Sequence, residues 1–88
     1  MCKRNQRVRI SSLTKREYDV ILREANFTEE QRKLFVELNR DQYYDFAIML
    51  MLNLGTNSRK YYELKSIVID KVERIAQEYG FYDSIKQR

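Results

Sequence analysis

The chain has no histidine, no proline, no tryptophan, a single cysteine and only two glycines. Without histidine and with one thiol it lacks the commonest general base and the usual zinc ligands, so we expect neither an enzyme nor a metal or cofactor site. Cys2 has no second cysteine with which to form an internal disulfide, which is typical of a reducing compartment. The longest apolar run, Phe46 to Leu52, is too short to span a membrane. We therefore expect a cytoplasmic protein without a membrane segment.

The scarcity of glycine and proline also leaves few turn signals, which disfavours an all-β fold. Hydrophobic residues make up 43% of the 88 residues, enough for one core but not for two. We predict one all-α domain of four to five helices over residues 13–88, preceded by a basic N-terminal arm over residues 1–12. The alternating residues Arg7-Val8-Arg9-Ile10 predict either a short strand or an extended segment in that arm.

Two capping boxes predict where the first two helices begin. Thr14 is followed three residues later by Glu17, and Thr28 is followed in the same way by Gln31. Asn26 is expected to end the first helix. Helical spacing predicts the buried faces of the two helices as Tyr18, Ile21, Leu22 and Ala25 in the first, and Leu34, Phe35 and Leu38 in the second.

Residues 43–54 are apolar except for Asp45 and Asn53, so we predict that they form either the most buried helix or an interface helix. Gly55 is expected to close this helix in the left-handed conformation. Asn57 or Ser58 then caps a final helix, the longest, which runs to about residue 79. Its predicted buried stripe is Tyr61, Leu64, Val68, Val72, Ile75 and Tyr79.

Two helices joined by a short glycine-containing turn are the outline of a helix-turn-helix, whose second helix presents its first turns to the major groove of DNA. Arginine and lysine side chains pair with guanine and asparagine pairs with adenine, whereas serine, tyrosine and a second lysine suit phosphates. The candidate DNA-binding residues on this helix are Asn57, Ser58, Arg59, Lys60, Tyr62 and Lys65.

The charge of the chain is concentrated at its start. All six charged residues before Glu17 are basic, whereas the rest of the chain carries slightly more acidic than basic residues. A basic arm suits a polyanion because each neutralised phosphate releases counterions. We therefore add Arg7 and Arg9 to the candidate DNA contacts. The alternative is that the arm only improves solubility.

The stretch Leu54-Gly55-Thr56-Asn57-Ser58-Arg59-Lys60-Tyr61-Tyr62-Glu63-Leu64-Lys65 resembles Leu-Gly-Ile-Ser-x-x-x-Tyr-Tyr-x-Leu-Lys of sigma-factor region-four-like domains, in particular those of small phage regulators of the ArpU type. Residues 25–31 are similar to the start of the preceding helix in small phage and mobile-element helix-turn-helix proteins. Met51 and Thr56 depart from the family pattern, which has a small residue and an apolar residue at those positions. The resemblance implies a transcriptional regulator that binds double-stranded DNA sequence-specifically.

Two alternatives also fit the pattern, one of another class of function and one a different kind of DNA-binding protein. A small helical protein–protein interaction module, such as a phage-encoded modulator of a host protein, would use apolar residues in excess of one small core. Those residues are Ile48, Met49, Leu52, Ile67 and Ile69. A homodimer satisfies both this hypothesis and DNA binding. A ribbon-helix-helix dimer would instead project Arg7 and Arg9 from a strand pair, but that motif would end near residue 50 and leave the second half unexplained.

Overall fold

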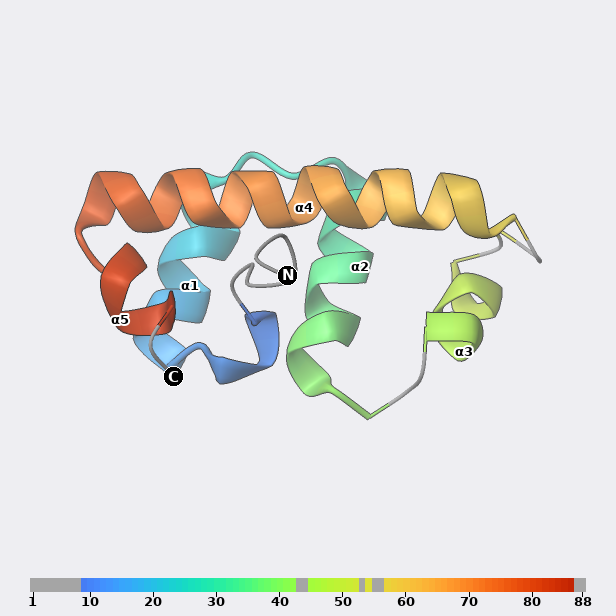
Figure 1. Ribbon diagram of the computed structural model, residues 1–88, viewed down its shortest axis with the longest axis horizontal. Helices are drawn as coiled ribbons and strands as arrows, with labels where there is room; N and C mark the ends of the chain where they lie inside the picture. The colour runs from blue at the N-terminus through green and yellow to red at the C-terminus, as the bar shows by residue number, and fades with distance from the viewer. Residues whose placement is uncertain (1–8, 43–44, 53, 55–56, 87–88) are drawn as a thin grey trace, which may run out of the picture.

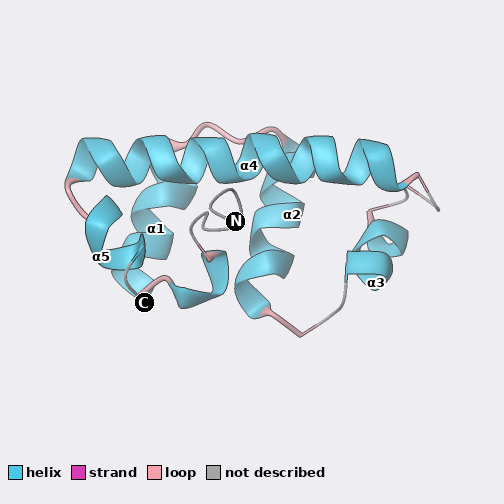
Figure 2. Ribbon diagram, in the orientation of Figure 1, coloured by secondary structure: helices cyan, strands magenta, loops and turns pink. Residues whose placement is uncertain are grey.

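Five α-helices and one 3₁₀ turn make up the described residues of this computed structural model (9–42, 45–52, 54 and 57–86), which contain no strand (Figure 2). In chain order they are η2 (Ile10–Ser12), α1 (Lys15–Glu24), α2 (Glu29–Arg40), α3 (Asp45–Met51), α4 (Ser58–Tyr79) and α5 (Tyr82–Lys86). The prediction of an all-α domain with four to five helices is confirmed.

Residues 10–12 form a 3₁₀ turn, at the end of the segment for which a short strand or an extended conformation was predicted. Arg7 and Val8 lie outside the described residues, but Ile10 begins the 3₁₀ turn η2. The backbone N–H and the hydroxyl of Ser12 both donate to the carbonyl of Arg9, at 3.0 and 2.7 Å, which closes the turn. Asn39 of α2 donates its amide to the carbonyl of Ile10 at 3.1 Å. These bonds fix residues 9–12 against α2.

Helix α4 is the longest element and the one around which the others are arranged. It spans the length of the molecule, and α1, α2, α3 and α5 lie along one side of it in Figure 1. All four pack against it. A helix of 22 residues is about 33 Å long, which is close to the longest dimension of the protein, 36 Å. The opposite side of α4 therefore remains open to solvent along much of its length.

The core lies between α4 and the two helices α1 and α2. The predicted stripe of α4 is buried at Tyr61, Val68, Val72 and Ile75, half-buried at Leu64 and exposed at Tyr79. The prediction for Tyr79 is wrong because this residue is in the last turn, where the helix has passed the core. The facing residues are Ile21 of α1, Ala25 at the end of that helix, and Leu34 and Phe35 of α2, all buried as predicted.

Both predicted capping boxes form. Glu17 and Gln31 each accept a hydrogen bond from a threonine N–H with their side chains, and each donates a backbone N–H to the hydroxyl of that threonine. Gln31 has a second role that the sequence did not indicate, because its side-chain oxygen also accepts from Nζ of Lys71 at 2.7 Å. That ammonium group donates to the carbonyl of Asn26 as well, at 3.2 Å. The start of α2 is thus bound to the middle of α4.

The prediction that residues 43–54 form either the most buried helix or an interface helix is met only in part by burial, since Ile48, Met49 and Leu52 are buried and other apolar residues of the segment are not. Helix α3 covers only Asp45 to Met51, and its Phe46, Leu50 and Met51 are exposed by 57%, 52% and 50%. Tyr43 and Tyr44 lie outside the described residues. A seven-residue helix that packs against α4 at one end of the molecule has one covered face, so its other apolar side chains face solvent.

Helix α4 ends where the sequence predicts. Gly80 follows it in the left-handed conformation, with φ of 82°, and its N–H donates back to Ala76 and Gln77. A fifth helix, α5, then places Ile85 in the core, so α4 is the longest helix but not the last. Among the described residues, none of the helices combines the length and the apolar character that crossing a membrane requires.

Candidate functional site

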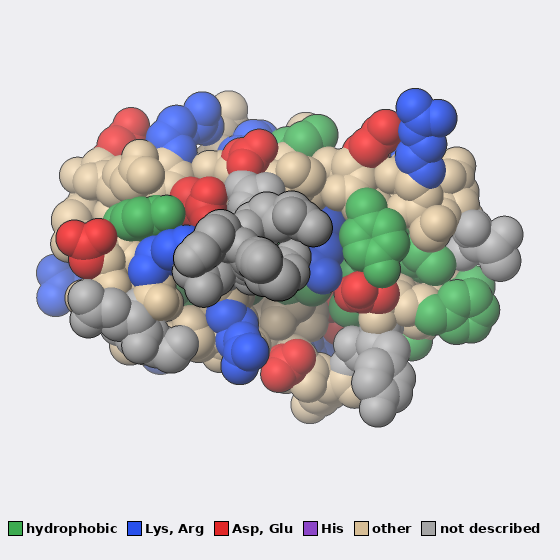
Figure 3. Space-filling view, in the orientation of Figure 1, with side chains coloured by type: hydrophobic (Ala, Val, Ile, Leu, Met, Phe, Trp, Pro, Cys, Tyr) green, Lys and Arg blue, Asp and Glu red, His purple; other side chains and the backbone are tan. Residues whose placement is uncertain are grey.

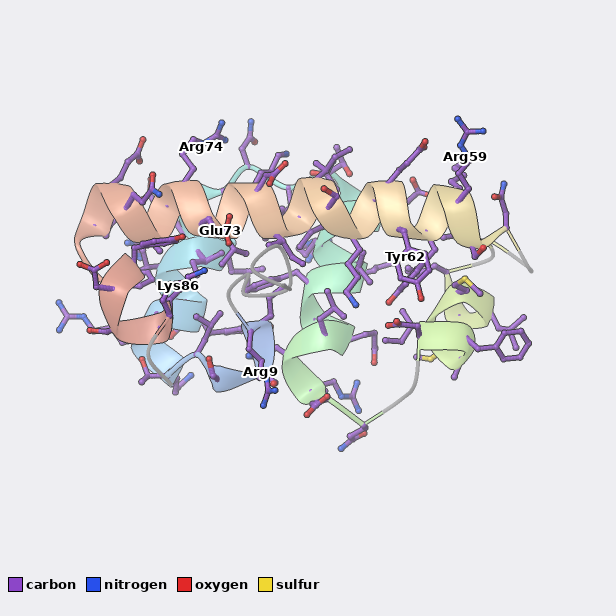
Figure 4. All side chains as sticks on the ribbon, in the orientation of Figure 1. Arg9, Arg59, Tyr62, Glu73, Arg74 and Lys86 are labelled. Atoms are coloured by element: carbon purple, nitrogen blue, oxygen red, sulfur yellow. The ribbon has the colours of Figure 1, made fainter. Side chains whose placement is uncertain are left out.

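The first two turns of α4 carry the predicted DNA contacts, and their side chains point in two directions. Asn57 caps the helix as expected, because its side-chain oxygen accepts from the N–H of Lys60 at 3.2 Å. Ser58, Arg59 and Lys60 are exposed. In Figure 4, Arg59 points away from the body of the protein, whereas Tyr62 points towards α3. The six predicted residues of this segment therefore do not share one face.

The side of α4 that faces α3 carries a polar cluster centred on Asp45. The hydroxyl of Tyr61 donates to Oδ1 of Asp45 at 2.6 Å, and the hydroxyl of Tyr62 donates to Oδ2 at 3.1 Å. Nζ of Lys65 lies 3.4 Å from Oδ1. It also lies 6.0 and 5.9 Å from the ring centres of Tyr61 and Tyr62. Asp45 thus joins the start of α3 to the first two turns of α4.

The cluster changes the pKa values of its members in a consistent way. Partial burial alone would raise the pKa of Asp45, but the Tyr61 hydrogen bond, the Lys65 charge and the Tyr62 hydrogen bond together hold it below its usual value. Burial and then the Asp45 hydrogen bond raise the pKa of Tyr61. The Asp45 hydrogen bond raises the pKa of Tyr62. At neutral pH the cluster holds a charged carboxylate and two neutral hydroxyls.

These contacts alter what Tyr62 and Lys65 offer to a ligand. Lys65, one of the candidate DNA contacts, is half-buried and does not lie on the solvent face of α4. Its ammonium group and the hydroxyl of Tyr62 both contact the carboxylate of Asp45. That carboxylate lies where a phosphate would have to bind. The cluster is therefore better described as the contact that fixes the angle between α3 and α4.

The side of α4 that faces solvent carries a row of exposed residues, which we call the outer ridge. It comprises Arg59, Glu63, Ser66 and Asp70, repeating every three or four residues opposite the buried stripe. Nε of Arg59 lies 3.5 Å from Oε2 of Glu63, and the two side chains are 90% and 65% exposed. Such an exposed pair contributes little to stability. The ridge begins with the basic residue Arg59, and its other charged residues, Glu63 and Asp70, are acidic.

The structure does not bring Arg9 and the start of α4 together. Arg9 is exposed, but it lies at the opposite edge of the molecule from Arg59 in Figure 4. Arg7 lies outside the described residues, as does Gly55, for which a left-handed turn was predicted. Residues 52–57 connect α3 to α4, a longer connection than the three or four residues usual for a helix-turn-helix.

An apolar surface on α3 lies beside the start of α4. On the side seen in Figure 3, most of the exposed hydrophobic side chains gather at this end of the molecule. We call Phe46, Leu50 and Met51 the α3 apolar face. The prediction that Ile48, Met49 and Leu52 would be exposed is wrong, since all three are buried. Because Phe46 and Leu50 are four residues apart, their side chains lie on the same side of the helix.

Two residues of the site were not singled out from the sequence. Asp45 was noted only as an interruption of an apolar run, although a lone acid there already indicated a specific partner. Glu63 stands four residues after Arg59, the spacing of a helical ion pair. That spacing was available in the sequence and could have placed Glu63 beside Arg59.

Comparison with known proteins adds no relative. The chain matches no protein-family description, no curated protein and no solved structure.

Proposed function

We propose that the protein binds double-stranded DNA sequence-specifically through the first turns of α4, and that it acts as a phage or mobile-element transcriptional regulator. The observation that carries the proposal is the exposure of Arg59 and Lys60 at the start of a helix whose opposite face is anchored in the core. Neither side chain is needed for folding, and both are of the type that pairs with guanine in the major groove.

The Asp45 cluster supports this proposal. DNA-reading side chains must be held in a fixed orientation, and sites on rigid helices are more precise than sites on loops. Tyr61 is fully buried and bonded to Asp45, so the first turns of α4 are attached both to the core and to α3. Asn57 caps the helix, and its remaining free backbone N–H groups and the positive end of the helix dipole favour a phosphate nearby.

We assign a separate role to each set of candidate DNA-binding residues. Arg59 and Lys60 read bases, and Ser58 and Asn57 contact the sugar-phosphate backbone beside them. Lys65 contributes to DNA binding indirectly, because its contact with Asp45 helps to fix the first turns of α4. Arg9 and the arm before it form a separate, sequence-independent contact, because Arg9 lies at the other edge of the protein.

The test is a salt titration of binding to a random-sequence duplex. We expect log Kd to change linearly with log salt concentration, with a slope of about 0.9 for each phosphate contacted. Removing residues 1–8 keeps Arg9, whose carbonyl closes η2, and should flatten this slope while the fold persists. A truncated protein with an unchanged slope would mean that the arm does not contact DNA. A full-length protein without measurable binding at low salt would refute the proposed function.

The α3 apolar face favours a second function, protein association, and we propose a second copy of the chain as the partner. Three large apolar side chains of one short helix are half or more exposed, which is uncommon on a monomer surface. The face lies beside the start of α4, so a two-fold dimer through it would present two recognition helices to a two-fold DNA site. A host protein bound at the same face is the alternative partner.

Replacing both Phe46 and Leu50 by glutamate is expected to convert a dimer to a monomer. Both side chains are exposed, so the fold should remain while the buried charges oppose association. Light scattering between micromolar and millimolar protein measures the change. Tyr79→Glu is the matched control, because Tyr79 is similarly exposed at the far end of α4. A wild-type protein that is monomeric over this whole range would exclude the homodimer.

A further inference from the structure

We propose that Glu63 is a specificity-determining residue that reads cytosine in the major groove beside a guanine read by Arg59. This inference rests on the proposed DNA binding through α4. Glu63 is the residue of the outer ridge that follows Arg59, one turn further along the helix. It is the ridge residue nearest Arg59 that carries a carboxylate, which accepts hydrogen bonds and donates none.

The position of Glu63 relative to Arg59 supports a paired role. The contact between them uses Nε of Arg59, which leaves the two terminal nitrogens of the guanidinium group available for the O6 and N7 atoms of guanine. Residues four apart are separated by about 6 Å along a helix, less than two base-pair steps of about 3.4 Å. The guanine and the cytosine are therefore expected within two base pairs of each other.

The chemistry of the carboxylate selects cytosine. In the major groove cytosine presents only an amino donor, whereas adenine adds an acceptor at N7, and guanine and thymine present acceptor oxygens. A carboxylate that meets an acceptor has no donor and is repelled, so the wrong base pair is penalised in addition to the right one being favoured. The neighbouring positive charge of Arg59 offsets the repulsion between Glu63 and the phosphates.

The test is selection of binding sequences from a randomised duplex library by the full chain, followed by affinity measurements on single-base variants of the enriched duplex. The wild type is expected to prefer cytosine at one position by about tenfold. Glu63→Ala should remove that preference alone. Glu63→Gln should shift it towards adenine, because glutamine pairs with the N6 and N7 atoms of adenine. Glu29→Gln, which alters an equivalent exposed pair with Lys33 on α2, should change no preference.

The outcomes separate this inference from the proposed function. If both Glu63 variants bind every duplex more tightly by one factor and keep the same preferences, Glu63 only repels phosphates and the inference is wrong. If the guanine preference disappears together with the cytosine preference, Glu63 positions Arg59 and reads no base, which also overturns it. A wild type that enriches no sequence refutes the proposed function, and this inference with it.

Discussion

Replacing Arg59 and Lys60 together by alanine is expected to abolish sequence-specific DNA binding and to leave the fold intact. Loss of one base-reading pair costs about 1–3 kcal/mol, so affinity for the preferred duplex should fall at least about tenfold. Affinity for random duplex should fall less, because only the charge contribution is lost. Both side chains are exposed and outside the buried stripe, so the unfolding free energy should change by less than about 0.5 kcal/mol. Fluorescence anisotropy with the two duplexes measures the difference.

Lys15→Ala with Arg16→Ala is the matched control for this variant. These residues also begin a helix, are exposed, and carry the same total charge, and Lys15 pairs with Asp19 as Arg59 pairs with Glu63. They belong to α1, away from the start of α4 (Figure 1). The control should lower both affinities by the same factor. If the Arg59 and Lys60 double variant bound the preferred duplex as tightly as the wild type does, DNA would bind to another surface of the protein.

Replacing Asp45 by alanine is expected to cause the largest loss of stability among the surface positions of the site. The hydroxyl of Tyr61 is fully buried and would lose its acceptor, and an unpaired buried donor costs about 1–3 kcal/mol. Tyr62 and Lys65 would lose their partner too, but they are more exposed and contribute less. We expect the free energy of unfolding, measured by urea denaturation, to fall by about 2 kcal/mol.

A double-mutant cycle isolates the contact between Asp45 and Tyr61. In Tyr61→Phe the buried hydroxyl is absent, so adding Asp45→Ala should cost much less than it does in the wild type, with a coupling of about 1 kcal/mol. Tyr62→Phe is the control, because its hydroxyl is exposed and its loss should have little effect. If Asp45→Ala lowered the free energy of unfolding equally with and without the Tyr61 hydroxyl, the contact between Asp45 and Tyr61 would not be what holds α3 to α4.

The pH dependence of stability provides a second measurement of the same contact. The lowered pKa of Asp45 means that its charge stabilises the fold above the unfolded value near 4, and that this stabilisation is lost as pH falls through the folded pKa. The pKa values of Tyr61 and Tyr62 are raised. Their contribution to the stability of the fold is therefore complete below about pH 10, the unfolded value, and is lost at higher pH. The stability difference between wild type and Asp45→Asn should therefore be constant between about pH 4 and 10, and should shrink in acid.

The sequence by itself determined the local structure of this protein. The two capping boxes, a cap at Asn57 or Ser58, the end of α4 before Gly80 and the inward direction of Tyr61 were all predictable. Each depends on residues within one or two turns of one another, through backbone hydrogen bonds or helical spacing. The absence of proline and the scarcity of glycine disfavoured an all-β fold, and the capping boxes and helical spacing predicted the all-α domain.

Only the tertiary structure decided which side chains are available at the site. Tyr62 and Lys65 suit a phosphate by type, yet Asp45, seventeen and twenty residues away, engages both. Ile48 and Phe46 are both apolar in the sequence, but Ile48 is buried and Phe46 is exposed. Burial and ion pairing between helices depend on how the helices pack, and a periodic pattern specifies a buried face without specifying the element that covers it.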